Sequence, residues 1–184
     1  MTVNPNLQVM IDGLEMIWAP GAEAVKVQQA LGVRELGQVS AVLKQAGYEI
    51  CYVDLPEKVS GFAQVIEGKP YIVLNRSKSA DHLQGTLPHE LAHHILHLGT
   101  GPDAQAGLSS QGIVEFQAYQ FAVMWIMLLA GDKEREAVLI QNPELMAVGA
   151  VSLFLSAGVV LVPIILNLLS LLSRPRLSAP VTGK

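Results

Sequence analysis

The sequence predicts an α+β domain with a small antiparallel three-stranded sheet, followed by one transmembrane helix. Two observations in residues 1–130 predict the domain: apolar residues recur at helical spacing, and three short apolar runs lie between the helical segments. A third observation predicts the membrane helix, because residues 145–173 contain no charged side chain. The chain is 51% hydrophobic and only 15% charged. A charged domain followed by an uncharged membrane helix explains this excess of hydrophobic over charged residues.

Helical spacing of apolar residues appears in three parts of the expected domain. Residues 23–46 come first, and Gly47 is placed to end the last helix of that stretch. Residues 79–98 and 111–130 follow with the same spacing and are joined by a loop of small residues. The charged residues 131–144 are expected to form a connector between the domain and the membrane helix.

Three strand-like runs lie between the first and second helical parts. They cover residues 48–55, 61–67 and 71–74 and are separated by turn residues around Pro56 and Gly68. Because the runs are short and follow one another closely, we expect an antiparallel meander that packs against the helices.

The uncharged residues 145–173 lie between Glu144 and Arg174. As a helix this segment is longer than the roughly 30 Å hydrocarbon core of a bilayer, and Pro163 predicts a kink within a single crossing. The alternative is a buried core or oligomerisation helix, although globular domains rarely bury a helix that is apolar on every face. Serine and asparagine side chains in the segment also offer contacts for self-association, and residues 174–184 form a short basic tail.

The charge distribution limits the kinds of molecule that the protein is expected to bind. All 16 acidic residues lie at or before Glu144, and the domain has no cluster of Lys and Arg, so we expect no direct binding of nucleic acid.

The single cysteine, Cys51, cannot form an internal disulfide. No Lys or Arg precedes Lys26, which argues against a secretory signal peptide. We therefore expect a single-pass protein of the cell membrane with the domain over residues 1–130 in the cytoplasm.

Four of the five histidines lie within residues 89–97, and residues 89–93 form an HExxH motif. On an α-helix, positions i and i+4 lie on one face, so the imidazoles of His89 and His93 can converge on one metal ion. Glu90 is near enough to take a proton from a water whose pKa Zn²⁺ lowers to roughly 7. The alternative is an ordinary amphipathic helix with surface histidines.

A catalytic zinc ion needs a third protein ligand. His97 continues the same face, but its Cα would lie about 12 Å along the helix from that of His89, and His94 points away. Glu115, at the start of the next expected helix, is the better candidate, because that helix can pack back against the first. Two histidines and one glutamate leave a fourth position open for water. The alternative for Glu115 is a solvated acid in the first turn of a helix.

Residues 86–93 read TLPHELAH, and residues 115–122 read EFQAYQFA. This pair of motifs, at this separation, resembles the ImmA/IrrE family of zinc metallopeptidases. The resemblance covers roughly residues 25–130 and implies a minimal gluzincin-like metallopeptidase domain that binds Zn²⁺.

The resemblance also implies roles for the residues of the motifs. His89, His93 and Glu115 would be the zinc ligands and Glu90 the general base. The implied activity is cleavage of a regulatory protein, often a helix-turn-helix transcriptional repressor, in a stress response. The remaining alternative is a non-catalytic zinc-containing sensor or scaffold that acts by binding proteins. Tyr119 is a further candidate as a hydrogen-bond donor to the reacting carbonyl, and His94 and His97 as groups that orient the ligands.

Overall fold

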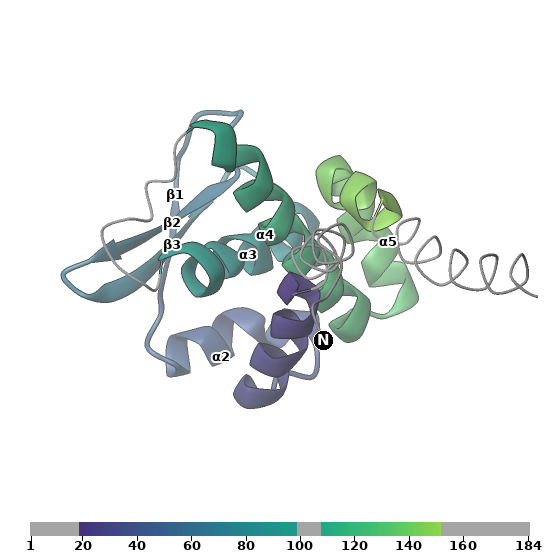
Figure 1. The fold of residues 1–184 in the computed structure, drawn as a ribbon, viewed down its shortest axis with the longest axis horizontal. Coiled ribbons are helices and arrows are strands. Elements are labelled where there is room, and N and C mark those ends of the chain that lie inside the picture. The colour runs from purple at the N-terminus through teal and green to yellow at the C-terminus, as the bar shows by residue number, and fades with distance from the viewer. Residues whose placement is uncertain (1–18, 99–107, 152–184) are drawn as a thin grey trace, which may run out of the picture. The chain divides into compact units, whose positions relative to one another are not determined.

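The computed structural model describes residues 19–98 and 108–151 (Figure 1). In chain order the elements are a helix over residues 19–31, the 3-10 helix η1 (Leu36–Gln38), α2 (Val39–Gln45), β1 (Glu49–Val53), β2 (Gly61–Ile66), β3 (Lys69–Asn75), α3 (Ala80–Ala92), the π-helix η2 (His93–Leu98), α4 (Leu108–Leu129), α5 (Asp132–Gln141) and a helix over residues 143–151. The predicted α+β class is confirmed.

The three strands form a mixed sheet in the order β1-β3-β2. β2 is antiparallel to β3, as predicted, but β1 is parallel to β3, so the predicted antiparallel meander is wrong. β3 takes the central place between β1 and β2, and its Ile72 and Leu74 are fully buried. The connection over residues 54–60 is long enough to pass the roughly 10 Å that separate the two outer strands.

The side chain of Asn75, at the end of β3, holds this connection in place. Its Nδ2 donates to the backbone oxygens of Leu55, Pro56 and Val59, at 3.2, 3.3 and 2.7 Å. Its Oδ1 accepts from the backbone N–H of Ser77 at 3.1 Å. Asn75 is itself fully buried, so these bonds satisfy a polar side chain that water does not reach. The loop leads directly into β2, which forms one wall of the site described below.

We expect Asn75→Ala to lower the free energy of unfolding by about 2–4 kcal/mol, because it removes several part-buried hydrogen bonds to the backbone of the loop. Urea denaturation of the full-length chain measures the change. Lys78→Ala is the matched control: Lys78 also bonds the loop, through the backbone oxygen of Glu57, but from an exposed position. The control is expected to cost less than about 0.5 kcal/mol. Equal losses in the two variants would contradict the role given to Asn75.

α3 is the central helix of the domain. It packs against β2 and β3 on one side and against α4 and α5 on the other, and residues 85–92 are all buried. Ser79 begins the helix as predicted, since its hydroxyl accepts from the backbone N–H of His82 at 3.2 Å. α4 supplies much of the core, and the indole N–H of Trp125 donates to the backbone oxygen of Ala24 at 2.7 Å. The first four residues of the HExxH motif, 89–92, therefore lie on the most buried helix that the structure describes.

The segment expected to be a charged connector, 131–144, contains helix α5. Val138 is fully buried, and α5 packs on α3. A side-chain carbon added at Gly85 of α3 would lie 2.6 Å from Nδ2 of Asn142 and 2.8 Å from Leu145, so the chain after α5 also passes close to α3. Much of the apparent linker therefore packs on the domain that it follows.

Within residues 19–98 and 108–151, one helical stretch is long and apolar enough to cross a membrane, Gly112–Leu129 in α4. Its residues Phe121, Trp125 and Ile126 are fully buried in the domain, which is also what a core helix of a soluble domain shows. The membrane helix expected from the sequence, 145–173, lies outside the described residues from residue 152 onward. Its first residue, Leu145, is 1% exposed.

Candidate metal centre

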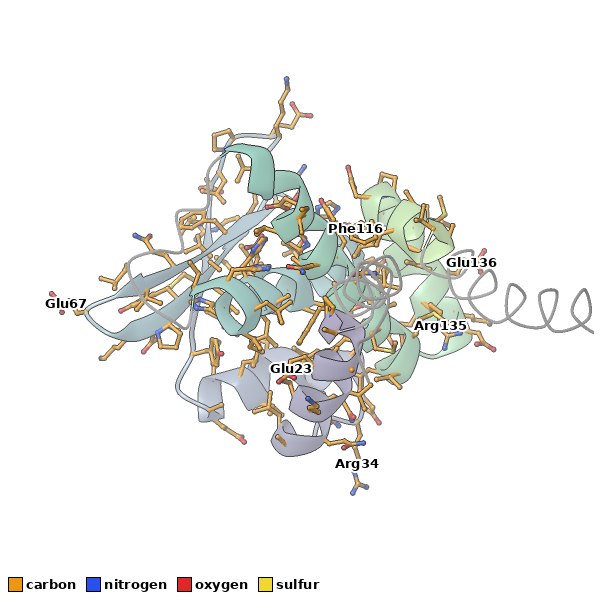
Figure 2. All side chains as sticks on the ribbon, in the orientation of Figure 1. Glu23, Arg34, Glu67, Phe116, Arg135 and Glu136 are labelled. Carbon is orange, nitrogen blue, oxygen red and sulfur yellow. The ribbon has the colours of Figure 1, made fainter. Side chains whose placement is uncertain are left out.

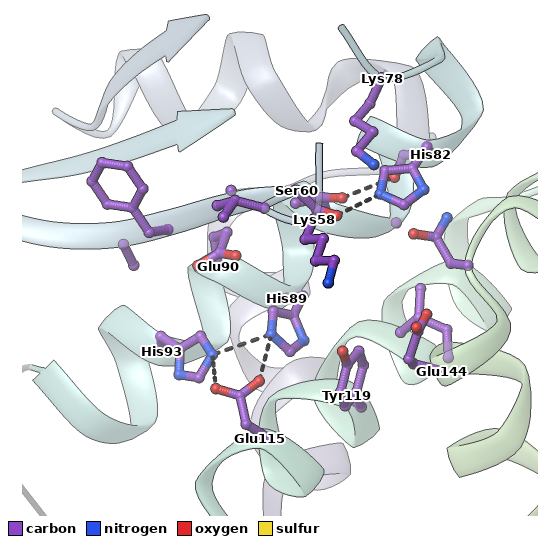
Figure 3. A pocket seen from close by; sticks show the side chains of 18 of the residues that line it. Lys58, Ser60, Lys78, His82, His89, Glu90, His93, Glu115, Tyr119 and Glu144 are labelled. Atoms are coloured by element: carbon purple, nitrogen blue, oxygen red, sulfur yellow. Dashed lines mark hydrogen bonds and ion pairs between the residues drawn. The ribbon is translucent and has the colours of Figure 1, made fainter. Parts of the chain in front are cut away.

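The HExxH motif occupies the last turns of α3 and the start of η2. His89 and Glu90 are buried, with 8% and 6% of their surface exposed, whereas His93 is partly exposed toward an open cleft. Glu115 comes from α4, whose first turns cross the end of α3 (Figure 3). The packing of α3 against α4 thus brings together residues that lie far apart in the sequence.

Three side chains converge on one point in Figure 3. Nε2 of His89 lies 3.2 Å from Oε2 of Glu115, and Nε2 of His93 lies 3.4 Å from Oε1 of the same carboxylate. The two Nε2 atoms are 3.2 Å apart. The cluster of His89, His93 and Glu115 is therefore compatible with a metal site, and the candidates from the sequence are the residues that form it.

The spacing of these donor atoms fits a tetrahedral zinc site. Ligand bonds of about 2.0–2.2 Å at tetrahedral angles place neighbouring donor atoms roughly 3.3 Å apart, close to the separations in this cluster. Hydrogen bonds alone satisfy the cluster poorly. If both Nε2 atoms carry protons for Glu115, two N–H groups face each other at 3.2 Å. A cation between the nitrogens and the carboxylate removes that conflict.

The charges of the cluster also suit a cation. Burial lowers the pKa of the His89 imidazole, which favours the neutral ring that a metal requires. The imidazoles of His89 and His93 hold the pKa of the Glu115 carboxyl well below its usual range. Burial raises the pKa of the Glu90 carboxyl to about 7, which is the range expected of a general base. The pKa values of the Glu90 and Glu115 carboxyl groups are therefore shifted in opposite directions although both groups lie in one site.

Glu90 lies against β2. A side-chain carbon added at Gly61 would stand 2.8 Å from the backbone oxygen of Val73, 3.0 Å from Cγ2 of Thr86 and 3.3 Å from Cγ of Glu90. Only a glycine lets the first residue of β2 approach α3 so closely. This role of Gly61 was not predicted from the sequence.

We expect Gly61→Ala to reduce catalytic turnover by about 10²-fold, because the added methyl group displaces Glu90 or the strand beside it. Zinc content is expected to stay unchanged, since Gly61 contacts none of the three clustered side chains in the close approaches above. Gly112→Ala is the control: this glycine lies in α4 with nothing within 4 Å of the added carbon, and activity should be kept. Steady-state kinetics and metal analysis of both variants check the prediction.

The remaining candidates lie around the cluster in different ways. The ring of Tyr119 packs on that of His89, with centroids 4.3 Å apart, and both line the cleft. His94 points elsewhere, because its Nε2 contacts the backbone oxygen of Tyr71 at 2.8 Å. His97 does not join the cluster but contacts His93 with its Nδ1, at 3.3 Å.

The helix type around His97 differs from the prediction. Residues 93–98 form a π-helix, whereas the spacing predicted α-helix to the end of the segment. His97 lies four positions after His93, a spacing at which helical side chains are neighbours, as His89 and His93 are. A local π-helix is difficult to recognise because its apolar spacing differs little over so few residues.

The cluster lies in a cleft of about 1180 Å³. Its walls come from the loop before β2, from the start of β2, from α3 and η2, from α4, and from residues 142–145. Figure 2 shows the side chains of the described elements on the ribbon, in the orientation of Figure 1. A cleft of this size accommodates several residues of a peptide chain.

The fold and the site together are those of a metallopeptidase-like domain: a histidine pair on a buried helix, a carboxylate from the next helix and a flanking strand. A peptidase family model described as an IrrE N-terminal-like domain matches residues 43–138. The chain belongs to this family, so the resemblance stated from the paired motifs is confirmed. No curated protein and no solved structure gives a significant match to the chain.

Proposed function

We propose that this protein is a membrane-anchored, zinc-dependent endopeptidase that cleaves a regulatory protein. The observation that carries the proposal is the convergence of His89, His93 and Glu115 within an open cleft, with Glu90 beside them. Three protein ligands are the number that hydrolytic zinc sites use, because the fourth position stays open. A purely structural site has no use for a buried carboxyl such as Glu90.

In the proposed mechanism the zinc ion would be held by the two imidazoles and the Glu115 carboxylate. When bound, it supplies a Lewis acid that polarises water and the scissile carbonyl. Glu90 takes a proton from the attacking water and passes it to the leaving amine. Its raised pKa suits both transfers, and its position against Gly61 limits the directions in which its carboxyl group can move.

The proposed substrate segment is an extended peptide. Among the described strands β2 pairs with β3 alone, and residues 61–63 of β2 line the cleft. An extended segment can add to this edge of the sheet by backbone hydrogen bonds, which bind a peptide without strong demands on its side chains. We propose that the segment belongs to a transcriptional regulator, such as a helix-turn-helix repressor acting in a stress response, because the family resemblance implies a substrate of that class.

Membrane anchoring is the second part of the proposal. Its support is the uncharged run of residues 145–173, which also offers a surface for self-association. We propose a cytoplasmic catalytic domain. Ser178→Cys in a Cys51→Ser background tests the orientation with a thiol reagent that does not cross membranes. Labelling in intact cells supports this topology, and labelling only after lysis overturns it.

Catalysis is tested on proteome-derived peptides with the zinc-loaded full-length chain. New peptide N-termini, identified by mass spectrometry, are expected with the wild type and not with Glu90→Gln at equal zinc content. Equal zinc in both proteins without cleavage by either one would favour the non-catalytic sensor or scaffold instead.

A further inference from the structure

Two polar contacts link Gln117 to His97 and His97 to His93, which is one of the three clustered side chains. Nδ1 of His97 lies 3.3 Å from Nδ1 of His93, and Nε2 of His97 lies 3.1 Å from Oε1 of Gln117. Gln117 comes from α4, as Glu115 does. α4 therefore contacts His93 twice, directly through Glu115 and indirectly through His97. The proposed catalytic mechanism uses neither His97 nor Gln117.

The chemistry of these groups fixes the direction in which the hydrogen bonds run. The amide oxygen of Gln117 only accepts, so Nε2 of His97 carries the proton. In the neutral ring of His97, Nδ1 is then bare and accepts a hydrogen bond from Nδ1–H of His93. His93 in turn has a bare Nε2, and this is the atom that faces His89 and Glu115.

We propose that His97 and Gln117 are positioning residues that hold His93 in the tautomer and ring orientation needed to bind a metal ion through Nε2. This inference rests on the proposed function, because it takes His93 to be a zinc ligand. Partners of this kind raise metal affinity by fixing the ring before the ion binds, since an unfixed imidazole must give up other orientations and tautomers.

The other histidine of the cluster is held differently. Nδ1 of His89 is buried and has no hydrogen-bond partner among the described residues. The His89 ring instead packs between other rings, 4.3 Å from that of Tyr119 and 4.8 Å from that of His93 in centroid distance. Hydrogen-bond control of the ring is therefore a property of His93, whose partner His97 lies four positions further along the chain.

The first test compares two variants of His97 by zinc affinity, measured in the full-length chain by competition with a chromophoric chelator. His97→Phe keeps an aromatic ring but cannot accept from His93, and its zinc affinity is expected to fall about 10–100-fold. His97→Asn places an amide oxygen near the former Nδ1, so it is expected to recover most of that loss. A general disturbance of the helix would not be repaired by asparagine.

The second test changes the far end of the contact chain. Gln117→Leu removes the acceptor and is expected to weaken zinc binding in the same direction as His97→Phe, whereas Gln117→Glu keeps an acceptor and is expected to retain affinity. His94→Phe is the control, because His94 contacts the backbone oxygen of Tyr71 instead of the cluster, and its affinity should stay within about twofold of wild type. Circular dichroism of the metal-free variants shows which ones fold.

The outcomes separate this inference from the proposed function. If the wild type binds no zinc, both are overturned. If the wild type binds zinc, tighter binding by His97→Asn than by His97→Phe, and by Gln117→Glu than by Gln117→Leu, supports the positioning role. If the two variants at each position bind zinc equally, whether as tightly as the wild type or more weakly, the positioning role alone is overturned. Should His97→Phe fail to fold, the pair at Gln117 decides.

Discussion

Glu90→Gln is expected to reduce hydrolysis by about 10²–10⁴-fold while leaving the zinc content unchanged. Glutamine matches the shape of the Glu90 side chain but cannot take a proton from water. The carboxyl group is buried beside the cluster and is not one of the three converging side chains, so the three proposed ligands remain. Single-turnover kinetics on an identified peptide, with zinc measured in the same samples, checks the result. Loss of zinc together with activity would show that Glu90 is a ligand instead of a base.

The same variant has a second, opposite effect on the metal-free protein. The pKa of Glu90 is raised from 4.5 to about 7 by burial, so the folded protein binds a proton that the unfolded chain releases. The stability associated with the protonated group is present below pH 4.5 and is lost as the pH rises through about 7. Glu90→Gln avoids that loss. It is expected to be more stable than wild type by about 1–3 kcal/mol at pH 8, with no difference near pH 4.

The sequence predicted those parts of the structure that depend on local spacing. The HExxH spacing predicted that His89 and His93 share one face, and the loop after them predicted that the next helix could return with Glu115. All three side chains meet in the structure, and their role as zinc ligands stays a prediction. The helix and strand segments were also found near their expected places, because apolar periodicity and turn residues are local signals.

The features that the sequence did not predict depend on contacts between distant segments. Strand order could not be read from three short runs, because the connection over residues 54–60 is long enough for β1 to pair with either β2 or β3. The packing of α5 was missed because a charged segment with one buried face resembles a connector. The close approach at Gly61 and the chain from Gln117 to His93 arise only when β2 and α4 are placed against α3 and η2. The contacts that position the side chains of the site therefore depend largely on tertiary packing.

Glu115→Ala is expected to weaken zinc binding by more than about 100-fold. Losing a residue that only hydrogen-bonds to a metal ligand typically weakens binding by roughly 10–100-fold, whereas this variant removes a donor atom from the cluster itself. Zinc present at 100 times its dissociation constant stabilises the folded wild type by about 2.7 kcal/mol. The increase in Tm that zinc gives the wild type should therefore be lost in Glu115→Ala. Scanning calorimetry of the full-length chain, with and without zinc, measures this difference.

Glu144→Gln is the matched control for this loss. Glu144 also lines the cleft, and its charge slightly opposes the lowering of the His89 pKa by burial, but it is not part of the converging group. Removing its charge changes the field in the cleft without removing a donor atom, so the zinc-dependent increase in Tm should persist. If Glu115→Ala keeps the increase and Glu144→Gln loses it, the third ligand is Glu144, and the centre would be completed by the chain after α5 instead of by α4.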